Sequence, residues 1–576
     1  MAWKRNRALV TAAAIITFCG ATVAEPKEVS ADGKQADTVV TGGRIKTPQG
    51  WAQAMAIKDG IIIAIGSDAE LATEVATARE RIDLGGASVF PGLQDMHVHP
   101  VFAGLEQMGC MFPYGAPPEA IAARLRECVA AAEPGEWIIG GNWVAAVFAP
   151  GEQTRHWLDR IAPDNPVMLE DEAHHSLWVN SRALELAGLT RVSPDPVGGI
   201  IEREADGSPN GLLRETAVEA VSIVAPKPTS EQRREALVWA SREMLSYGIT
   251  SYMIASIRDE ELADIAALSG SEDIKQRVRG CMVWAPATAS SPEYGLDLIA
   301  RRNLFRTPRF QPDCVKIFLD GVPTESRTAA MLEPYLHAGA TSPHDHGTLM
   351  VPQEELDRKV AEFDRQGLHI KFHAAGDGAV RAGVDAVAHA RKVNGIGGPS
   401  HHVGHTTFAA ASDFARAAEV GLAIEFSPYI WYPTPIASVD IARVVGSERM
   451  ERWVPIRDAL DSGVLVVAGS DWSVVPSVNP FLAIETMVTR QKPGGSEETL
   501  GLGQSISIDE ALEIFTGNGA RIMGLRDRVG TLEVGMEADF FISRDNLLEM
   551  PLSEIHKLKV EETWIQGEKV YDRSEL

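Results

Sequence analysis

The sequence contains little cysteine, with five residues in a chain of 576. Four of them are widely scattered, at Cys110, Cys128, Cys281 and Cys314, which excludes the closely paired spacing of a zinc knuckle. Internal repeats and low-complexity tracts are also missing. An oxidising compartment would permit a Cys110–Cys128 disulfide, but spacing alone leaves that pairing open.

Basic residues are outnumbered, with 54 lysines and arginines against 79 aspartates and glutamates, so the net charge is −25. This balance argues against nucleic acid or an anionic membrane surface as a partner. The hydrophobic share of 45% and the charged share of 23% are ordinary for a soluble globular protein. The length allows one large domain with additions, or several smaller domains.

The apolar stretch near the start, residues 8–18, is too short to span a membrane. Three basic residues precede it and the small residues Thr22-Val-Ala24 follow it, which is the pattern of a cleavable export signal. We therefore predict that residues 1–24 are a signal peptide. The mature protein is then periplasmic or secreted, with no stable insertion in a membrane.

Both ends of the remaining chain have the texture of short strands and turns. Residues 38–65 contain several such strands with a hairpin signal at Lys58-Asp-Gly60. The same texture returns in residues 529–542 and 560–570. We therefore predict that residues 25–89 and 526–576 together form one small β-sandwich.

The middle of the chain, residues 90–525, alternates strand and helix patterns, which favours parallel βα units. Eight short, mainly apolar strands are expected. Eight is the number for a (β/α)₈ barrel of the TIM type, whose active site lies at the carboxyl ends of the strands. The expected strands are the one leading to His97 and residues 249–255, 278–284, 314–319, 369–374, 401–405, 422–426 and 464–469.

One stretch, from about residue 104 to 225, does not follow this alternation. It is rich in proline and glycine and carries Trp137, Trp143, Trp157 and Trp178. We interpret it as an insertion after the first barrel strand, in a position to cap the barrel mouth. The alternative for the tryptophans is that they form the core of the insertion itself.

Polar residues stand where the expected barrel strands end. His97 and His99 are two apart on a strand, so both rings can point into one cavity and serve as metal ligands. His373, His405 and Asp471 each close a later strand. Taken singly, each of these residues has a simpler explanation as a cap of a loop or helix. Their order along the chain predicts a metal site.

Lys316 lies within an otherwise apolar strand, Asp313-Cys-Val-Lys-Ile-Phe-Leu-Asp-Gly321. A buried lysine costs free energy unless it is paired with an acid or chemically modified. It therefore joins the candidate metal residues.

With these residues in place, the sequence resembles the amidohydrolase superfamily, and within it the amidohydrolase-3 (YtcJ-like) branch. The resemblance covers nearly the whole chain after the signal peptide. The motifs that carry it are Phe90-Pro-Gly-Leu-Gln-Asp-Met-His-Val-His99, His175-Ser-Leu-Trp-Val-Asn-Ser-Arg-Ala-Leu-Glu-Leu-Ala-Gly188, Asp206-Gly-Ser-Pro-Asn-Gly-Leu-Leu-Arg-Glu215, Val315-Lys-Ile-Phe-Leu-Asp-Gly321, His373-Ala-Ala-Gly-Asp-Gly-Ala-Val380 and Gly469-Ser-Asp471.

The resemblance implies a (β/α)₈ barrel with a β-sandwich built from both termini, and it implies two divalent metals. Zinc is the expected ion for mixed imidazole and carboxylate ligands. His97, His99 and Asp471 would hold the more buried metal. His373 and His405 would hold the other, and Lys316, carbamylated by carbon dioxide, would bridge the two. Manganese, iron or cobalt could occupy the same ligands.

The sequence departs from the family pattern at two places. The segment Ser400-His-His-Val-Gly-His405 offers three histidines where the family usually has one, so His402 remains an alternative to His405. Gly378 stands where the family usually has a basic residue, so we do not carry the family's substrate contacts over to this position.

The resulting hypothesis is a metal-dependent amidohydrolase that cleaves a C–N bond of amide, carbamate or formamide type. A metal-bound hydroxide attacks the carbonyl carbon, and Asp471 passes the proton to the leaving nitrogen. One alternative is a mononuclear deaminase, or an ester or lactone hydrolase, on the same scaffold. Another is a binding or regulatory protein on a degenerate barrel, which the intact set of candidate ligands disfavours.

Aromatic residues near the expected mouth predict an apolar or aromatic small-molecule substrate. The alternative is that these aromatics pack loop against loop. A homo-oligomer is possible, but no feature of the sequence locates an interface. The candidate substrate-binding residues are His175, Trp178, Asp320, Tyr429 and Trp472.

Overall fold

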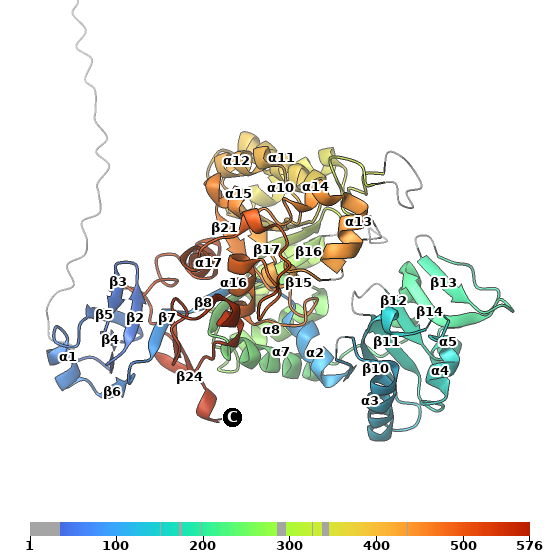
Figure 1. Cartoon of the computed structure of the whole chain (residues 1–576), viewed down its shortest axis with the longest axis horizontal. Helices are drawn as coiled ribbons and strands as arrows, with labels where there is room; N and C mark the ends of the chain where they lie inside the picture. The colour runs from blue at the N-terminus through green and yellow to red at the C-terminus, as the bar shows by residue number, and fades with distance from the viewer. Residues whose placement is uncertain are drawn as a thin grey trace, which may run out of the picture.

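A computed structural model describes residues 35–575 except 114, 150, 172–175, 197–198, 285–294, 325–326, 337–344 and 435. The predicted signal peptide, residues 1–24, and the candidate residue His175 lie outside the described residues. Figure 1 shows three parts: a β-rich part containing the first strands, a central barrel, and a separate lobe beyond helix α2.

The central part is a sheet of eight parallel strands, each paired with its neighbour in chain order. This confirms the predicted barrel, because all eight expected strands are present. The strands are β8 (Leu93–Val98), β15 (Ile249–Ile257), β16 (Arg277–Trp284), β17 (Phe310–Phe318), β18 (His369–Ala374), β19 (His401–His405), β20 (Leu422–Phe426) and β21 (Val466–Ala468).

Helices connect successive strands, as parallel strands require. The first of them, α7, begins with a capping box in which Thr229 and Gln232 exchange hydrogen bonds. The connecting helices are α7 (Ser230–Leu245), α8 (Asp259–Ser269), α9 (Leu296–Arg301), α10 (Gln353–Arg365), α11 (Asp377–Asn394), α12 (Ala411–Val420), α13 (Ala442–Val445), α14 (Ser447–Met450) and α15 (Ile456–Asp461). After β21 come α16 (Pro480–Thr489), α17 (Ile508–Phe515) and α18 (Gly517–Ile522).

The barrel closes where its last strand meets its first. The amide of Asp471 donates to the carbonyl oxygen of His97 at 2.7 Å, and the amide of His99 donates to that of Trp472 at 2.6 Å. Gly469 lies so close to His97 that a β-carbon there would stand 2.3 Å from the histidine side chain. Only glycine therefore permits this approach of the two strands.

Both ends of the chain contribute to one β-rich part, as predicted. Its mixed sheet places β7 (Ser88–Pro91) directly beside β22 (Phe540–Ser543), so a strand of the N-terminal segment is hydrogen-bonded to a strand of the C-terminal segment. The order in this sheet is β24 (Glu568–Asp572), β23 (Glu562–Ile565), β22, β7, β2 (Arg44–Thr47) and β3 (Gly50–Ala52). The second sheet has the order β5 (Ile61–Gly66), β4 (Ala54–Lys58), β1 (Thr38–Thr41) and β6 (Glu80–Asp83). The short helix α1 (Ala72–Thr77) lies between β5 and β6 in the chain.

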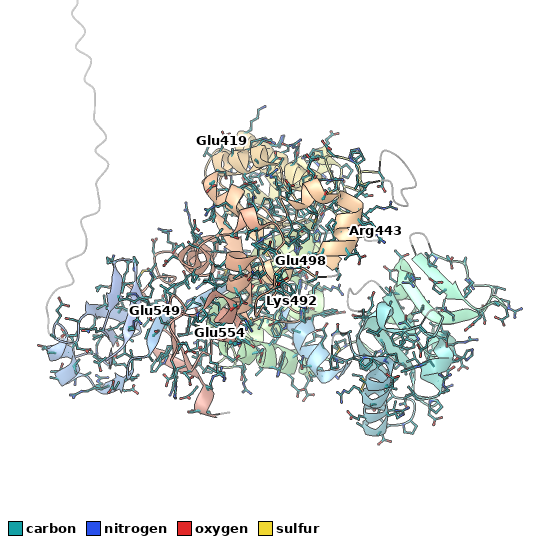
Figure 2. All side chains as sticks on the ribbon, in the orientation of Figure 1. Glu419, Arg443, Lys492, Glu498, Glu549 and Glu554 are labelled. Atoms are coloured by element: carbon teal, nitrogen blue, oxygen red, sulfur yellow. A yellow bond between two sulfur atoms is a disulfide. The ribbon has the colours of Figure 1, made fainter. Side chains whose placement is uncertain are left out.

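Ion pairs join this β-rich part to the rest of the chain. Arg277, at the start of barrel strand β16, is buried and paired with Glu537 and Asp539. Arg44 on β2 is paired with Glu549, which Figure 2 labels between the sheets and the barrel. The C-terminal segment therefore connects the barrel base to the strands of the N-terminal segment.

The lobe after α2 (Pro100–Met108) has a six-stranded sheet of its own, beside the barrel in Figure 1. Trp143, Trp157 and Trp178 pack in its core, which is the alternative that the sequence left open for them. The strands, in sheet order, are β13 (Gly199–Arg203), β14 (Pro209–Glu215), β12 (Ser176–Val179), β11 (Val167–Asp171), β10 (Ile138–Trp143) and β9 (Cys110–Met111). The helices are α3 (Pro118–Ala131), α4 (Arg155–Asp159), α5 (Ser181–Leu186) and α6 (Glu219–Ser222).

Two disulfides are present among the described residues. Cys110–Cys128 joins β9 to α3, which settles the pairing that the spacing left open. Cys281–Cys314 joins the neighbouring barrel strands β16 and β17, whose register places the two residues opposite each other. No helix in the described ranges is both long and apolar enough to cross a membrane.

Candidate active site

Two histidines lie at the end of the first barrel strand. His97 is on β8, and His99 follows at the N-cap of α2, where Pro100 begins the helix. The spacing of two directs both rings to the same side of the strand. The His97 ring is fully buried, whereas the His99 ring is partly exposed. One ring therefore lies at the floor of the site and the other closer to solvent.

Asp471 faces both rings from the other side of the barrel seam. Its Oδ1 lies 3.3 Å from Nε2 of His97 and 3.2 Å from Nε2 of His99. Its Oδ2 lies 3.8 Å from Nδ1 of His405. One ligand atom each from His97, His405 and Asp471 fall within 4.8 Å of one another. Imidazole nitrogens with one carboxylate oxygen are a donor set that suits zinc and similar divalent metals.

The imidazoles in this cluster are in the right protonation state to bind a metal. Burial lowers the pKa of His97 and that of His405 well below the ordinary histidine value. Both rings are therefore neutral near pH 7, and each keeps one nitrogen lone pair.

Two residues of the cluster have an unusual backbone. His405 and Asp471 adopt the left-handed conformation, with φ of 69° and 60°. For residues other than glycine this conformation costs about 1–3 kcal/mol and is concentrated at functional sites. The backbone thus turns both side chains into the same space.

His373 lies next to this cluster at the end of β18, with its ring centroid 4.5 Å from that of His405. Its Nδ1 lies 3.1 Å from Oδ1 of the buried Asp320. The Asp320 carboxylate also accepts the backbone amides of Ala330, Ala375 and Gly376 at 2.8–3.0 Å. Because the carboxylate accepts from Nδ1, Nε2 of His373 is left as the nitrogen that can bind a metal.

Lys316 is buried on β17 and has no hydrogen-bond or ion-pair partner among the described residues. Its Nζ lies 4.9 Å from the centroid of the Phe318 ring. Burial lowers the pKa of this amine to about 7. A buried amine without an acid partner fits carbamylation, since the neutral form reacts with carbon dioxide and the product is an anion that metals bind.

The structure also separates His405 from its alternative, His402. His405 belongs to the group that could hold a metal ion, whereas the fully buried His402 lies against Lys371 and Glu425. Burial lowers the pKa of His402 to about 4. His402 therefore belongs to a polar layer below the site.

Sequence reasoning missed this layer. Lys371 and Glu425 each interrupt an apolar barrel strand, the same signal that singled out Lys316. Both side chains are fully buried and form an ion pair. The signal was present for each residue, but their contact depends on the closure of the barrel.

The candidate substrate residues that the structure describes are mostly enclosed. Trp178 is fully buried and donates its indole N–H to the carbonyl oxygen of Thr154 in the lobe core. Tyr429 is buried too, with its hydroxyl 3.3 Å from the carbonyl oxygen of Val478. Trp472 is 6% exposed and packs on Trp239. Asp320, as described above, lies beneath His373.

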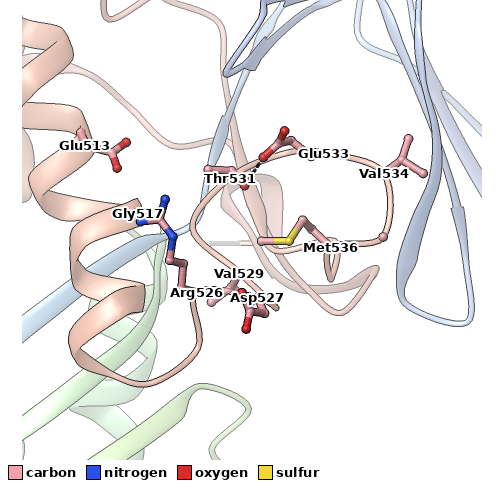
Figure 3. Close-up of a pocket in the computed structure, with 10 residues that line it drawn as sticks. Glu513, Gly517, Arg526, Asp527, Val529, Thr531, Glu533, Val534 and Met536 are labelled. Atoms are coloured by element: carbon pink, nitrogen blue, oxygen red, sulfur yellow. Dashed lines mark hydrogen bonds between the residues drawn. The ribbon is translucent and has the colours of Figure 1, made fainter. Parts of the chain in front are cut away.

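A pocket of about 410 Å³ lies away from this site, between α17, α18 and the segment that leads to the β-rich part. Figure 3 shows charged and small residues around it, among them Glu513, Arg526, Asp527 and Glu533. None of its lining residues belongs to the histidine cluster.

Comparison with known proteins identifies the class of this enzyme. A family model described as the amidohydrolase family matches residues 80–571. The chain belongs to this family, and it is therefore a hydrolytic enzyme.

Individual relatives agree with this assignment. The YtcJ protein of Bacillus subtilis is 28% identical over 534 residues, covering 91% of this chain and 96% of its own. The N-substituted formamide deformylase of Arthrobacter pascens is 24% identical over 540 residues, covering 91% and 95%. A metal-dependent hydrolase of Pyrococcus horikoshii superposes with a TM-score of 0.72 at 22% identity, covering 89% and 99%. The last comparison supports the fold.

Proposed function

We propose that this amidohydrolase cleaves a C–N bond of amide, carbamate or formamide type, using two divalent metals with zinc as the default ion. The observation that carries the proposal is the convergence of His97, His405 and Asp471 at the carboxyl end of the barrel. A divalent metal in such a site supplies a nucleophile from water at neutral pH and polarises the carbonyl under attack.

The proposed roles of the residues follow from their positions. His97 and His99 present Nε2 toward Asp471, and these three residues would hold one metal. His373 and His405, at the ends of β18 and β19, would hold the other. Lys316, as its carbamate, would supply the anionic oxygens between the two sets. Asp471, which touches the ligand nitrogens and remains partly exposed, would take the proton of the attacking water and return it to the leaving nitrogen.

For the substrate we propose an apolar or aromatic small molecule. The relative named N-substituted formamide deformylase supports a formamide or a similar amide. Trp472 follows Asp471 directly in the chain, and among the described candidates it stands nearest in sequence to the reacting group.

A second candidate function follows from the size of the cluster. Three residues bring ligand atoms within 4.8 Å of one another, which is enough for one ion. This observation favours the alternative of a mononuclear deaminase, or an ester or lactone hydrolase, on the same ligands.

We also propose that the protein is exported. The signal pattern of residues 1–24 motivates this, and the two disulfides support an oxidising compartment.

The test combines a metal count with an activity screen. The exported protein is purified without chelator, its metals are counted by mass spectrometry, and ¹³C NMR of the folded protein in ¹³C-labelled bicarbonate is used to look for a carbamate on Lys316. It is then assayed on panels of N-substituted formamides, amides and carbamates, with purines, esters and lactones as comparison. Two metals and C–N cleavage support the proposal. One metal with turnover of purines, esters or lactones favours the alternative, and no metal after reconstitution would contradict both.

A further inference from the structure

Beneath the metal cluster, Glu425 on β20 contacts His97. Its Oε1 lies 2.6 Å from Nδ1 of His97, and both side chains are fully buried. A carboxylate can only accept, so the hydrogen resides on Nδ1 of the imidazole. The lone pair is then on Nε2, the nitrogen that faces Asp471.

The other oxygen of Glu425 is held by Lys371, the neighbouring buried cation on β18. Nζ of Lys371 also donates to the carbonyl oxygen of Met96 at 3.0 Å and lies 3.2 Å from Nε2 of His402. Met96 precedes His97 on β8, so Lys371 fixes the backbone of the ligand strand as well as the carboxylate beneath the ligand ring.

Lys371 and Glu425 compensate each other's charge. The ammonium of Lys371 is paired with the carboxylate of Glu425. Lys316, the other buried lysine, has no such acid partner among the described residues. A buried ion pair adds little stability over an apolar replacement of similar volume. The chain therefore keeps two charges in its core where stability alone does not require them.

We propose that Glu425, held in place by Lys371, is a positioning residue for metal binding: it fixes the tautomer and the orientation of the His97 ring. This inference rests on the metal site of the proposed function. It adds a second layer of residues through which the chain sets the metal affinity, because the partner of a ligand histidine determines which nitrogen is free and how basic it is.

The molecule contains a comparable contact outside the candidate metal site. Glu485 on α16 is fully buried, and its Oε2 lies 2.7 Å from Nδ1 of His556, near the C-terminal end of the chain. Neither residue belongs to the candidate metal site. Substituting Glu485 therefore removes a buried glutamate–histidine contact without touching a metal ligand.

The first experiment compares Glu425→Gln with Glu485→Gln. The glutamine side chain can be oriented in two ways. If its oxygen accepts from Nδ1 of His97, its NH₂ group faces the ammonium of Lys371. If its NH₂ group donates to Nδ1, the hydrogen of the imidazole moves to Nε2. Both outcomes impair the ligand. We expect Glu425→Gln to bind zinc about 10–100-fold more weakly in chelator competition and to shift the visible spectrum of the cobalt-loaded protein. Glu485→Gln should lower the melting temperature yet leave both metal readouts unchanged.

A second variant keeps the inference testable if the single substitution impairs folding. In the double variant Lys371→Met with Glu425→Gln the ammonium is gone, so the glutamine oxygen can accept from Nδ1 of His97 while its NH₂ meets Nε2 of His402. We expect zinc affinity to recover to within about tenfold of the wild type.

The outcomes distinguish the two levels of the argument. If the wild type binds zinc and Glu425→Gln binds it equally well with an unchanged cobalt spectrum, the positioning role is wrong and the proposed function survives. If the double variant is folded but binds no more tightly than Glu425→Gln, the role of Lys371 is wrong. If the wild type takes up no metal even after reconstitution, the proposed function fails and this inference fails with it.

Discussion

The backbone amide of Asp471 donates to the carbonyl oxygen of His97 across 2.7 Å, so the last strand of the barrel is joined to the first at two candidate metal ligands. The hydrogen bond that closes the barrel therefore also sets the distance between their side chains, 3.3 Å from Oδ1 to Nε2. Anything that loosens the seam should loosen the site, which is why substitutions here must preserve the backbone to be informative.

Asp471→Asn meets that requirement. Asparagine tolerates the left-handed backbone that Asp471 adopts, so the fold should be retained. The amide cannot take up a proton, and we expect kcat to fall by about 10²–10⁴-fold. Circular dichroism and steady-state kinetics on the best substrate of the screen measure the two effects. Retained turnover in a folded variant would show that Asp471 does not transfer the proton.

The barrel could be predicted because its strands are short apolar runs that end in polar residues, as at His373 and Asp471. These local signals suffice to predict how many strands the barrel has and that their carboxyl ends lie together. The pairing of Cys281 with Cys314 needed the register of β16 against β17, which no local pattern contains. The contact of Glu425 with His97 likewise needed the closed barrel.

The aromatic residues were harder to assign from sequence. Trp178 and Tyr429 bury large apolar surfaces wherever a loop allows it, and burial in a core satisfies this tendency as well as a ligand does. Their identity alone therefore does not distinguish a packed ring from one that contacts a substrate. Only the structure shows the acceptors of their hydrogen bonds, which are the carbonyl oxygen of Thr154 for Trp178 and that of Val478 for Tyr429.

His405 and His402 give a matched pair of substitutions. We expect His405→Asn to lose metal on dialysis, because it removes one of the clustered ligands and asparagine again tolerates the local backbone. His402→Asn should keep its metal through the same dialysis but lose about 1–3 kcal/mol of stability, since it disturbs a buried polar layer. Metal analysis and denaturant unfolding separate the two. Equal metal loss in both variants would contradict the placement of His402 below the site.

If the protein is exported as proposed, the disulfides predict the state of its thiols. All four cysteines after residue 24 are paired in the structure, so denatured protein from the exported fraction should contain no free thiol. The same chain made without residues 1–24 in a reducing cytoplasm should contain four, because thiols are kept reduced there. Thiol titration in denaturant measures both. Free thiols at Cys281 and Cys314 in exported protein would contradict that pair.

Lys316 predicts a pH dependence of stability in the metal-free protein. Burial lowers its pKa to about 7, so below this pH the folded state must hold a buried charge. Above it the folded amine is neutral while the unfolded chain still binds the proton. The unfolded state then carries more protons, and the stability of the wild type rises with pH by up to about 1.4 kcal/mol per pH unit.

Lys316→Met lacks this titration, so its advantage in unfolding free energy over the wild type should be largest near pH 6 and shrink toward pH 9. Carbamylation requires the same neutral amine, and bicarbonate should therefore promote zinc uptake by the wild type more at pH 8 than at pH 6, and not at all in Lys316→Met. Denaturant unfolding across this range and zinc titration with and without bicarbonate test the two halves. A stability difference independent of pH would mean that Lys316 stays charged in the folded protein, and carbon dioxide would then have no amine to react with.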